Sequence, residues 1–313
     1  MAFTRCGAGA PEVTQSRFLL IKSVCLIAYV FFRSSLGFCN VTYKAWASRE
    51  QRSALISLVF SSRIRWILPN DYLAVTAYTR RMNDGITQPF LCTCQDSNAY
   101  IVKGRPKLRQ SELAAEFISA HLARSLELAI PDFCVVDVGR ELIEFMPSLR
   151  GQLDPGPAFA TKYIEGCSTL NLQQARTSVN VQDQKRIFFF DRWINNSDRS
   201  LTEFGGNVNI IFDPLNNRYY LIDHNLSFAQ AVEDEEYDVH VYSANGRAWF
   251  YDMMDKPELL DLANAAIASL DQVFSEIPDV WLPDGDNDRE SYFSEIRTCL
   301  SRVNNDDFWS KII

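Results

Sequence analysis

The 313-residue sequence predicts an α+β fold with two lobes, a small antiparallel sheet followed by a mainly helical part. Three observations predict this order. Short apolar runs bounded by turn residues crowd into residues 73–103, as in strands joined by tight turns. Apolar residues at helical spacing dominate after residue 180, interrupted by a short hairpin pattern at 210–222. The hydrophobic content of 47 % is enough to bury a sizeable core.

In the first lobe, taken as residues 67–166, each element has its own local signal. Apolar and polar residues alternate over the expected strands, and Leu113, Phe117 and Leu122 recur at helical spacing behind Ser111, a good N-cap. The pattern predicts strands at 73–78, 90–94, 99–103, 132–138 and 159–166, and a helix at 111–128.

The second lobe, taken as residues 167–313, is predicted to begin with an apolar helix at 182–194. Two short strands, 210–212 and 219–222, flank the turn Asp213-Pro214-Leu215-Asn216-Asn217 and indicate a β-hairpin. Helices are expected at 248–252 or longer, 259–276 and 289–303.

Residues 1–66 differ from the rest of the chain in charge. They carry nine basic and two acidic residues, a net charge of +7, whereas the whole chain has a net charge of −8. The segment is interpreted as a basic, poorly packed N-terminal extension, with helix expected at 17–33 and 50–60. An organelle-targeting leader and an upstream extension from a misassigned start codon are both compatible with it. Its apolar stretch, 18–32, is interrupted by Lys22 and is too short to span a membrane.

The composition argues against several classes of protein. The remaining body is acidic, which argues against direct nucleic-acid binding. The eight cysteines form no C-x-x-C pair and the three histidines lie far apart, which argues against a zinc site. Scattered free thiols are typical of a reducing compartment, so a cytoplasmic protein is expected.

Three oxygen-bearing side chains mark the hairpin and the loop before it. Asp198 lies in the loop, Asn209 precedes the first strand and Asp223 follows the second. A carboxylate and an amide oxygen suit a hard Mg²⁺ ion, and a separate Asp can accept the proton of an attacking hydroxyl. Asn and Asp are also common turn residues, so each position alone has a purely structural explanation. Their order between apolar strands favours phosphoryl transfer.

Three stretches around these residues resemble the catalytic segment of HipA-like kinase domains: Asp198-Arg199, Asn209-Ile210-Ile211 and Leu221-Ile222-Asp223-His224-Asn225. That group shares its loop order with phosphatidylinositol kinases and, more remotely, with protein kinases. The resemblance implies a protein-kinase-like fold that uses ATP and Mg²⁺. It further implies Asp198 as the catalytic base and Asn209 and Asp223 as metal ligands.

Two features depart from the kinase pattern. Asp198 and Asn209 are eleven residues apart, against five in the H-R-D-x-x-x-x-N loop of kinases, so residues 201–206 resemble an insertion and Asn207 becomes a rival metal ligand. The Asp-Phe-Gly signature is also absent, since His224 and Asn225 follow Asp223.

The resemblance also implies nucleotide-binding residues in the first lobe. Lys103 ends a predicted strand, like the kinase lysine that pairs with ATP phosphates, and Glu116 would hold it in place. Glu112, one helical turn earlier, is an alternative to Glu116. Without the resemblance, Lys103 would be a solvated surface lysine and the two glutamates an exposed acidic helix face.

Two further segments are implied by position in the family. Residues 85–88, including Gly85, Thr87 and Gln88, occupy the place of the loop that covers the phosphates, although no G-x-G-x-x-G pattern is present. Lys162 and Tyr163 fall at the end of the last strand of the first lobe, where the adenine is contacted mostly through the backbone. A simple linker there is equally compatible.

The sequence therefore predicts an ATP- and Mg²⁺-dependent phosphotransferase with a hydroxyl acceptor, for which a Ser or Thr of a protein is favoured. A catalytically inactive, nucleotide-binding pseudokinase is the alternative, to which the inserted residues point. A membrane-associated lipid kinase is a third hypothesis that depends on the basic N-terminal segment. The acceptor itself and the oligomeric state have no signal in the sequence.

Overall fold

The computed structural model describes residues 72–82, 87–202, 205–229 and 232–312. The helices expected within residues 1–66 and the loop residue Gly85 lie outside this part of the chain.

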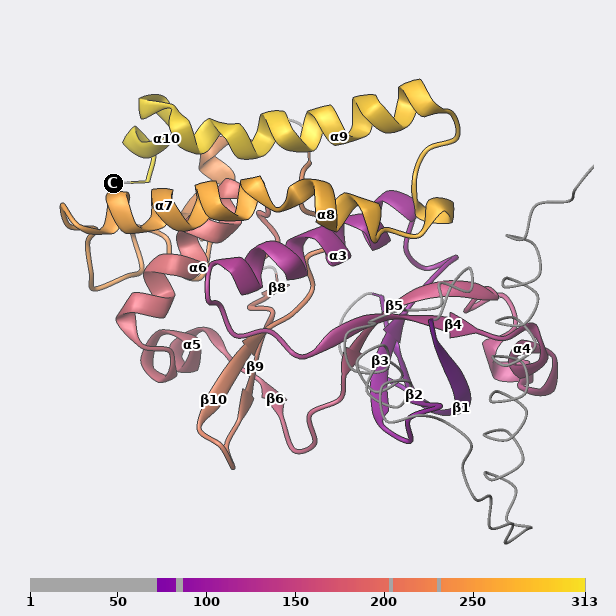
Figure 1. Cartoon of the computed structure of the whole chain (residues 1–313). Coiled ribbons are helices and arrows are strands. Elements are labelled where there is room, and N and C mark those ends of the chain that lie inside the picture. The colour runs from indigo at the N-terminus through magenta and orange to yellow at the C-terminus, as the bar shows by residue number, and fades with distance from the viewer. Residues whose placement is uncertain (1–71, 83–86, 203–204, 230–231, 313) are drawn as a thin grey trace, which may run out of the picture. The chain divides into compact units, whose positions relative to one another are not determined.

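Five strands form a closed barrel in the order β1-β2-β3-β5-β4 (Figure 1). They are β1 (Leu73–Arg81), β2 (Phe90–Cys94), β3 (Ala99–Lys103), β4 (Phe133–Val138) and β5 (Gly156–Lys162). The bounds predicted for β2 and β3 agree with the structure because the turn between them is local. Asp96 accepts a hydrogen bond from the backbone N–H of Asn98 (3.0 Å), and Ser97 between them has a φ of 64°.

The expectation of a purely antiparallel sheet is wrong at one pair of strands. β1 and β4 are parallel, with Leu73 opposite Val136 and Ala74 opposite Asp137. The reason is topological, because strand directions cannot alternate all the way around a closed ring of five. The narrow interior is filled by side chains from all the strands, including Phe90, Val102 and Val136.

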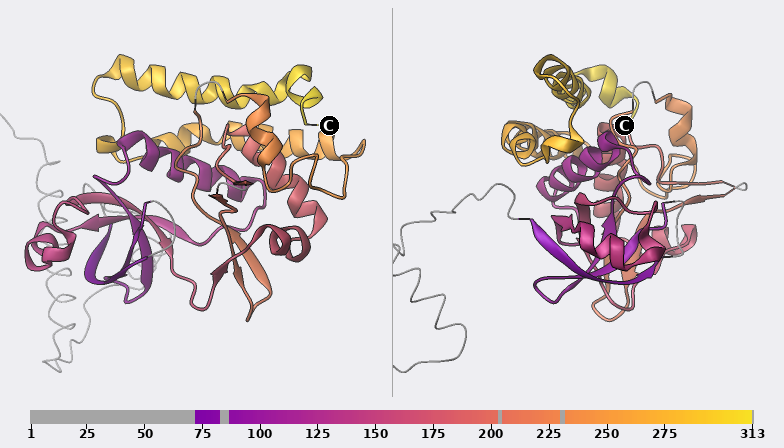
Figure 2. Two further views of the ribbon diagram at one scale, coloured as in Figure 1. Left: turned by 180° about the vertical axis from the view of Figure 1, so that it is seen from behind. Right: turned by 90° about the vertical axis from the view of Figure 1, so that its right-hand side faces the viewer.

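The longer helices pack together on one side of the barrel strands. In both views of Figure 2, α7 and α9 lie on the side of α3 away from the barrel. One apolar core joins them, with Phe117 of α3, Phe189 and Trp193 of α6, and Leu300 of α9 all buried in it. The longer helices are α3 (Gln110–Ser125), α6 (Val181–Trp193), α7 (Asp255–Ala268) and α9 (Asp286–Ser301).

Shorter helices complete the described chain, and several of them have no clear sequence signal. They are α4 (Arg140–Phe145), α5 (Leu172–Ser178), α8 (Leu270–Ser275) and α10 (Asp306–Ser310). Single 3-10 turns are found at η1 (Pro147–Leu149), η2 (Asp234–Val239), η3 (Asp279–Trp281) and η4 (Arg302–Asn304). No helix within the described residues has both the length and the apolar character needed to cross a membrane.

Three predicted elements need correction. Residues 248–252 contain no helix; buried Trp249 and Tyr251 alternate there with exposed Phe250, as in extended chain. The helix predicted at 259–276 is two helices, α7 and α8, separated at Ser269, whose hydroxyl donates to the carbonyl of Ala266 (2.8 Å). The strand predicted at 159–166 begins at Gly156 and ends at Lys162.

Two small antiparallel strand pairs lie in the segment between Asp198 and Asp223. β9 (Ile210–Asp213) pairs with β10 (Arg218–Leu221), and β6 (Ser168–Thr169) adds to the free edge of β9. Asp213 closes their turn by accepting the backbone N–H groups of Leu215 (2.9 Å) and Asn216 (3.2 Å). Separately, β7 (Ser200–Thr202) pairs with β8 (Gly205–Asn207).

Candidate active site

A cavity of about 360 Å³ lies between the β3–β5 face of the barrel and the β9–β10 pair. This volume is within the range of small-molecule sites. One part of its wall is apolar, formed by Ile101, Phe133, Phe159, Ile211 and Leu221, and another carries the charged side chains of Lys103, Glu116 and Asp223. The cavity can therefore hold a flat apolar group at one end and a charged group at the other.

Lys103 joins the barrel to α3 and to the residue after β10. Its Nζ donates to Oδ1 of Asp223 (2.8 Å) and to Oε1 of Glu116. The second oxygen of Glu116 accepts the backbone N–H of His224 (3.1 Å), so the carboxylate fixes the lysine and the chain beyond β10 together. Burial lowers the pKa of Lys103, but Asp223 and Glu116 outweigh burial and raise it, so the ammonium group stays charged.

Asp223 is held in a backbone conformation that non-glycine residues seldom adopt, with φ of 64°. The strand β10 ends two residues before it, and the left-handed turn directs the chain back toward α3. Burial raises the pKa of Asp223, but Lys103 outweighs that effect and holds the pKa below its usual range. The side chain is therefore anionic, with oxygens of the kind that can bind a metal ion.

Asp198 and Asn209 meet on the other side of Asp223. Nδ2 of Asn209 donates to Oδ2 of Asp198 (3.0 Å), and the carbonyl of Asn209 accepts the backbone N–H of Ile222 (3.1 Å). Burial, and after it the negative charge of Asp223, raises the pKa of Asp198. A carboxylate with a raised pKa is a better proton acceptor than an ordinary aspartate.

The inserted residues explain how Asp198 and Asn209 meet across eleven positions of sequence. Most of the insertion folds as the β7–β8 pair, in which Ser200 lies opposite Asn207 and Thr202 opposite Gly205. The chain therefore leaves the loop after Arg199 and returns next to it at Asn207, where the two residues form a bridge. An insertion of this kind lengthens the spacing without separating the two side chains.

The oxygens around Asp223 fit a hard divalent cation. Oδ1 of Asn209 is buried and has no hydrogen-bond partner, as expected of an atom that needs a ligand outside the chain. Asn207 differs, because its Oδ1 accepts the backbone N–H of Asn209 (3.1 Å). A carboxylate and an amide oxygen are hard donors, which suit Mg²⁺ better than zinc. Within the described residues, no group of three or more His, Cys, Asp or Glu side chains could hold a metal.

The remaining predicted residues divide into those that line the cavity and those that do not. Thr87, Lys162 and Tyr163 line it. Gln88 is not among the lining residues, and its carbonyl accepts from Nε of Arg81 (3.2 Å). Glu112, the alternative partner of Lys103, instead caps the start of α3 by accepting the backbone N–H of Arg109 (2.6 Å).

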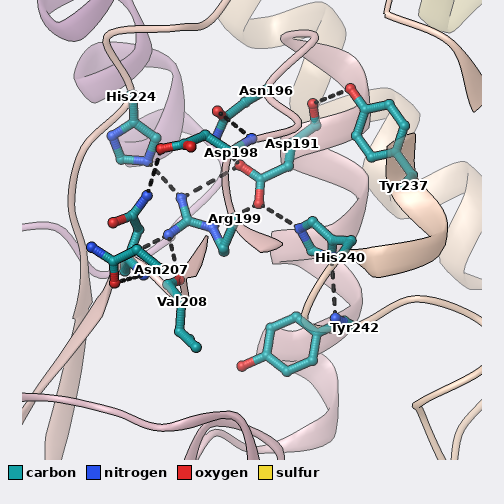
Figure 3. Close-up of polar contacts among 11 residues, drawn as sticks. Asp191, Asn196, Asp198, Arg199, Asn207, Val208, His224, Tyr237, His240 and Tyr242 are labelled. Atoms are coloured by element: carbon teal, nitrogen blue, oxygen red, sulfur yellow. Dashed lines mark hydrogen bonds and ion pairs between the residues drawn. The ribbon is translucent and has the colours of Figure 1, made fainter. Parts of the chain in front are cut away.

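A second charged cluster, not among the sequence predictions, is centred on Arg199 (Figure 3). Nε of Arg199 donates to Oδ2 of Asp191 (2.7 Å), and both side chains are fully buried. Nη1 donates to the carbonyl of Asn209 (2.5 Å) and Nη2 donates to Nε2 of His224 (3.1 Å). Arg199 therefore connects the backbone of Asn209, one candidate metal ligand, with His224, the residue after the other candidate, Asp223.

His240 completes this cluster on the far side of Asp191. Its Nδ1 accepts the backbone N–H of Tyr242 (3.1 Å), so the other ring nitrogen, Nε2, donates to Oδ2 of Asp191 (2.9 Å) (Figure 3). Burial lowers the pKa of His240 despite the neighbouring carboxylate. Burial raises the pKa of Asp191, but Arg199 and then His240 hold it well below its usual range.

Comparison with known proteins is consistent with this geometry. The family model of HipA-like kinases matches residues 75–312. The chain belongs to the HipA-like kinase family. Residue 75 lies in β1 and residue 312 follows α10, so the match includes the barrel, the cavity and both charged clusters.

Solved structures similar to this HipA-like kinase are distant in sequence. A proinflammatory kinase of Helicobacter pylori, CtkA, is 11 % identical, with 77 % of this chain and 98 % of that chain covered and a TM-score of 0.45. A second solved structure is a complex of the Shewanella oneidensis MR-1 toxin–antitoxin system HipA, HipB and its operator DNA. The matched chain is 12 % identical, with 84 % of this chain and 74 % of that chain covered and a TM-score of 0.39. No curated protein sequence matches the chain.

Proposed function

We propose that this HipA-like kinase transfers the γ-phosphate of ATP, with Mg²⁺, to a hydroxyl group, and that a Ser or Thr of a protein is the acceptor. The observation that carries the proposal is the ion pair of Lys103 with Asp223 on the wall of the cavity, with Asp198 close enough to Asp223 for their charges to interact. The barrel and the helices would form two lobes around the nucleotide, with Lys162 and Tyr163 at the adenine end.

Each charged residue has a role that its surroundings support. Lys103, kept charged by Glu116 and Asp223, would bind a phosphate oxygen. Asp223 and Asn209 would hold the metal ion, which neutralises negative charge on the phosphates when it is bound. Asp198, with its raised pKa, would orient the acceptor hydroxyl and accept its proton.

The hydrogen bond between Asn209 and Asp198 supports separate roles for the two polar atoms of the Asn209 amide. Asn209 uses its amide N–H on Asp198 and leaves its oxygen free, so one side chain can position the base and contact the metal together. Asn207 supports Asn209 from the backbone side. The pseudokinase alternative loses its main argument, since the inserted residues do not separate Asp198 from Asn209.

The test is ATP turnover by the full chain with Mg²⁺, measured as phosphate release and as self-phosphorylation. The proposal expects Asp198→Ala to lower turnover by about 10²- to 10⁴-fold, the usual contribution of a positioned base, while binding of ATP is retained. The control is Asp261→Ala, an exposed aspartate on α7. Equal turnover in wild type and Asp198→Ala, or ATP binding by wild type without turnover, would overturn the proposal.

A further inference from the structure

The charged end of the cavity carries more negative than positive charge. Lys103 faces two carboxylates, Glu116 and Asp223, and Asp198 lies close enough to Asp223 for their charges to interact. A nucleotide triphosphate is itself strongly anionic, so it would be repelled by these side chains without additional positive charge. A metal ion would supply part of that charge, and basic residues elsewhere on the wall are candidates for the remainder.

Arg80 is a basic residue on this wall whose charge is not already paired. Arg80, Lys103 and Lys162 are the basic residues that line the cavity within the described chain. Lys103 is paired with its two carboxylates, whereas the side chains of Arg80 and Lys162 have no ion pair or hydrogen bond among the described residues. Lys162 also lines a neighbouring cavity next to Asp132 and Glu165, and so belongs partly to another surface.

A β-bulge places Arg80 on the cavity side of β1. Tyr78 lies opposite Cys92 and Arg80 opposite Leu91, so β1 has one extra residue, Thr79, against β2. Because of this shift, Arg80 falls in the cross-strand row of Leu91, and that row continues through Ile101 to Thr161, both of which line the cavity.

The next residue of β1 has a structural partner of its own. The guanidinium of Arg81 lies over the ring of Phe90, 5.5 Å from its centroid, and donates to the carbonyl of Gln88 (3.2 Å). Because successive side chains of a strand point to opposite faces, Arg81 packs on Phe90 of β2 while Arg80 lines the cavity, and the bulge sets which of the two arginines is on which face.

We infer that Arg80 binds the phosphate chain of the nucleotide. The row of Arg80 passes through Ile101, which lies two residues before Lys103 on β3. Arg80 is therefore about 10 Å from β3 across two strand spacings, and Lys103 lies about 7 Å further along that strand. A guanidinium on a long flexible side chain can extend over part of this separation and contact, with two N–H groups, the oxygens of a phosphate chain that lies between the two basic residues. This inference rests on the proposed function, since it assumes that the cavity takes ATP.

The experiment compares how wild type, Arg80→Gln and Arg80→Lys bind ATP, ADP and adenosine, by calorimetry with Mg²⁺ present. Loss of a charge-assisted contact predicts a Kd for ATP about 10- to 100-fold higher in Arg80→Gln. The Kd for adenosine should stay within about twofold of wild type, because the lost contact is to phosphate alone. Arg80→Lys should recover part of the affinity, since a lysine binds phosphate as a point charge.

The control is Arg140→Gln, an exposed arginine on α4 that does not line the cavity. Arg80 is exposed, so its variants should keep the thermal midpoint of wild type, which is measured in parallel. An unchanged Kd for ATP in Arg80→Gln, or an equal loss for ATP and adenosine, would overturn the inference while leaving the proposed function intact. Wild type that binds none of the three compounds would overturn both.

Discussion

Two clusters of charged side chains contact the segment from Asn209 to His224, and they differ in what surrounds them. Lys103, Glu116 and Asp223 line a cavity that a ligand can enter, and Lys103 and Asp223 keep exposures of 11 % and 19 %. Asp191, Arg199 and His240 are completely enclosed by protein. In the sealed cluster each charged group has a protein partner, whereas near the open cluster Oδ1 of Asn209, whose amide donates to Asp198, has no hydrogen-bond partner in the described part of the chain. The sealed cluster therefore supports the loop, and we propose the open cluster as the part that binds a ligand.

Removal of the arginine from the sealed cluster is the strongest test of this difference. Arg199→Met should lower the free energy of unfolding by about 3–5 kcal/mol, because it leaves the Asp191 carboxylate buried without its main partner. Chemical denaturation measures the effect. The control is Arg105→Met, whose partner Asp154 is 3.9 Å away at an exposed site, and it should have no measurable effect. A loss below about 1 kcal/mol in Arg199→Met would show that the sealed cluster is not a structural support.

Loss of the cation from the open cluster should lower stability less and ATP turnover more. Lys103→Met should cost about 1–3 kcal/mol of stability, since Asp223 is partly hydrated. ATP turnover should fall at least about 10²-fold because a contact to the transferred phosphate is lost. Lys107→Met, an exposed lysine beyond β3, is the control. If Lys103→Met unfolds the protein as strongly as Arg199→Met, the distinction between the clusters is wrong.

Glu116 offers a milder change within the open cluster. Glu116→Gln keeps the shape of the side chain but weakens its hold on Lys103 and on the backbone of His224. We expect kcat to fall about 10- to 100-fold through misplacement of the lysine, with KM for ATP changed much less. Steady-state kinetics separate the two parameters. A change confined to KM would mean that Glu116 affects nucleotide binding and not the alignment of Lys103.

The sealed cluster predicts a dependence of stability on pH. Burial lowers the pKa of His240 in the folded protein, so below the ordinary histidine pKa of about 6.5 the unfolded chain binds more protons than the folded one. Stability is therefore complete above that pH and falls as the pH drops below it, by at most about 1.4 kcal/mol per pH unit for this group. Protonation of Nδ1 would also oppose the N–H of Tyr242.

The contribution of His240 can be separated from that of the other groups by difference. We expect His240→Gln to show a shallower loss of unfolding free energy than wild type between pH 7 and pH 5.5, about the window in which the unfolded histidine becomes protonated. His224, whose pKa burial and then Arg199 lower to about 3, contributes equally to both proteins. Parallel pH profiles for the two proteins would show that His240 is not held neutral.

More of the open cluster than of the sealed cluster is predictable from the sequence. Asp198, Asn209 and Asp223 are predictable from their order around two short apolar strands, a pattern visible over a few residues, whereas Lys103 follows from the resemblance to HipA-like kinases. The structure brings them together, and their roles remain predictions. The bounds of β2 and β3 were predictable for the same local reason.

The features that sequence reasoning missed depend on residues far apart in the chain. Arg199 stands next to Asp198, but its importance appears only with Asp191 and His240, which fold around it from α6 and from the chain after η2. The parallel pairing of β1 and β4 follows from closure of the barrel and has no local signal. The bulge at Thr79 exists only in relation to β2, so Arg80 resembled any other exposed arginine.

The most direct test of the central claim, that the open cluster binds ATP together with Mg²⁺, is a crystal structure with a non-hydrolysable ATP analogue and Mn²⁺ in place of Mg²⁺. The anomalous signal of manganese locates the ion without ambiguity. We predict an ion bound by Asp223 and by Oδ1 of Asn209, with a phosphate oxygen on Lys103. An ion held by Asn207 while Oδ1 of Asn209 stays unliganded, or an analogue bound away from Lys103, would contradict the account.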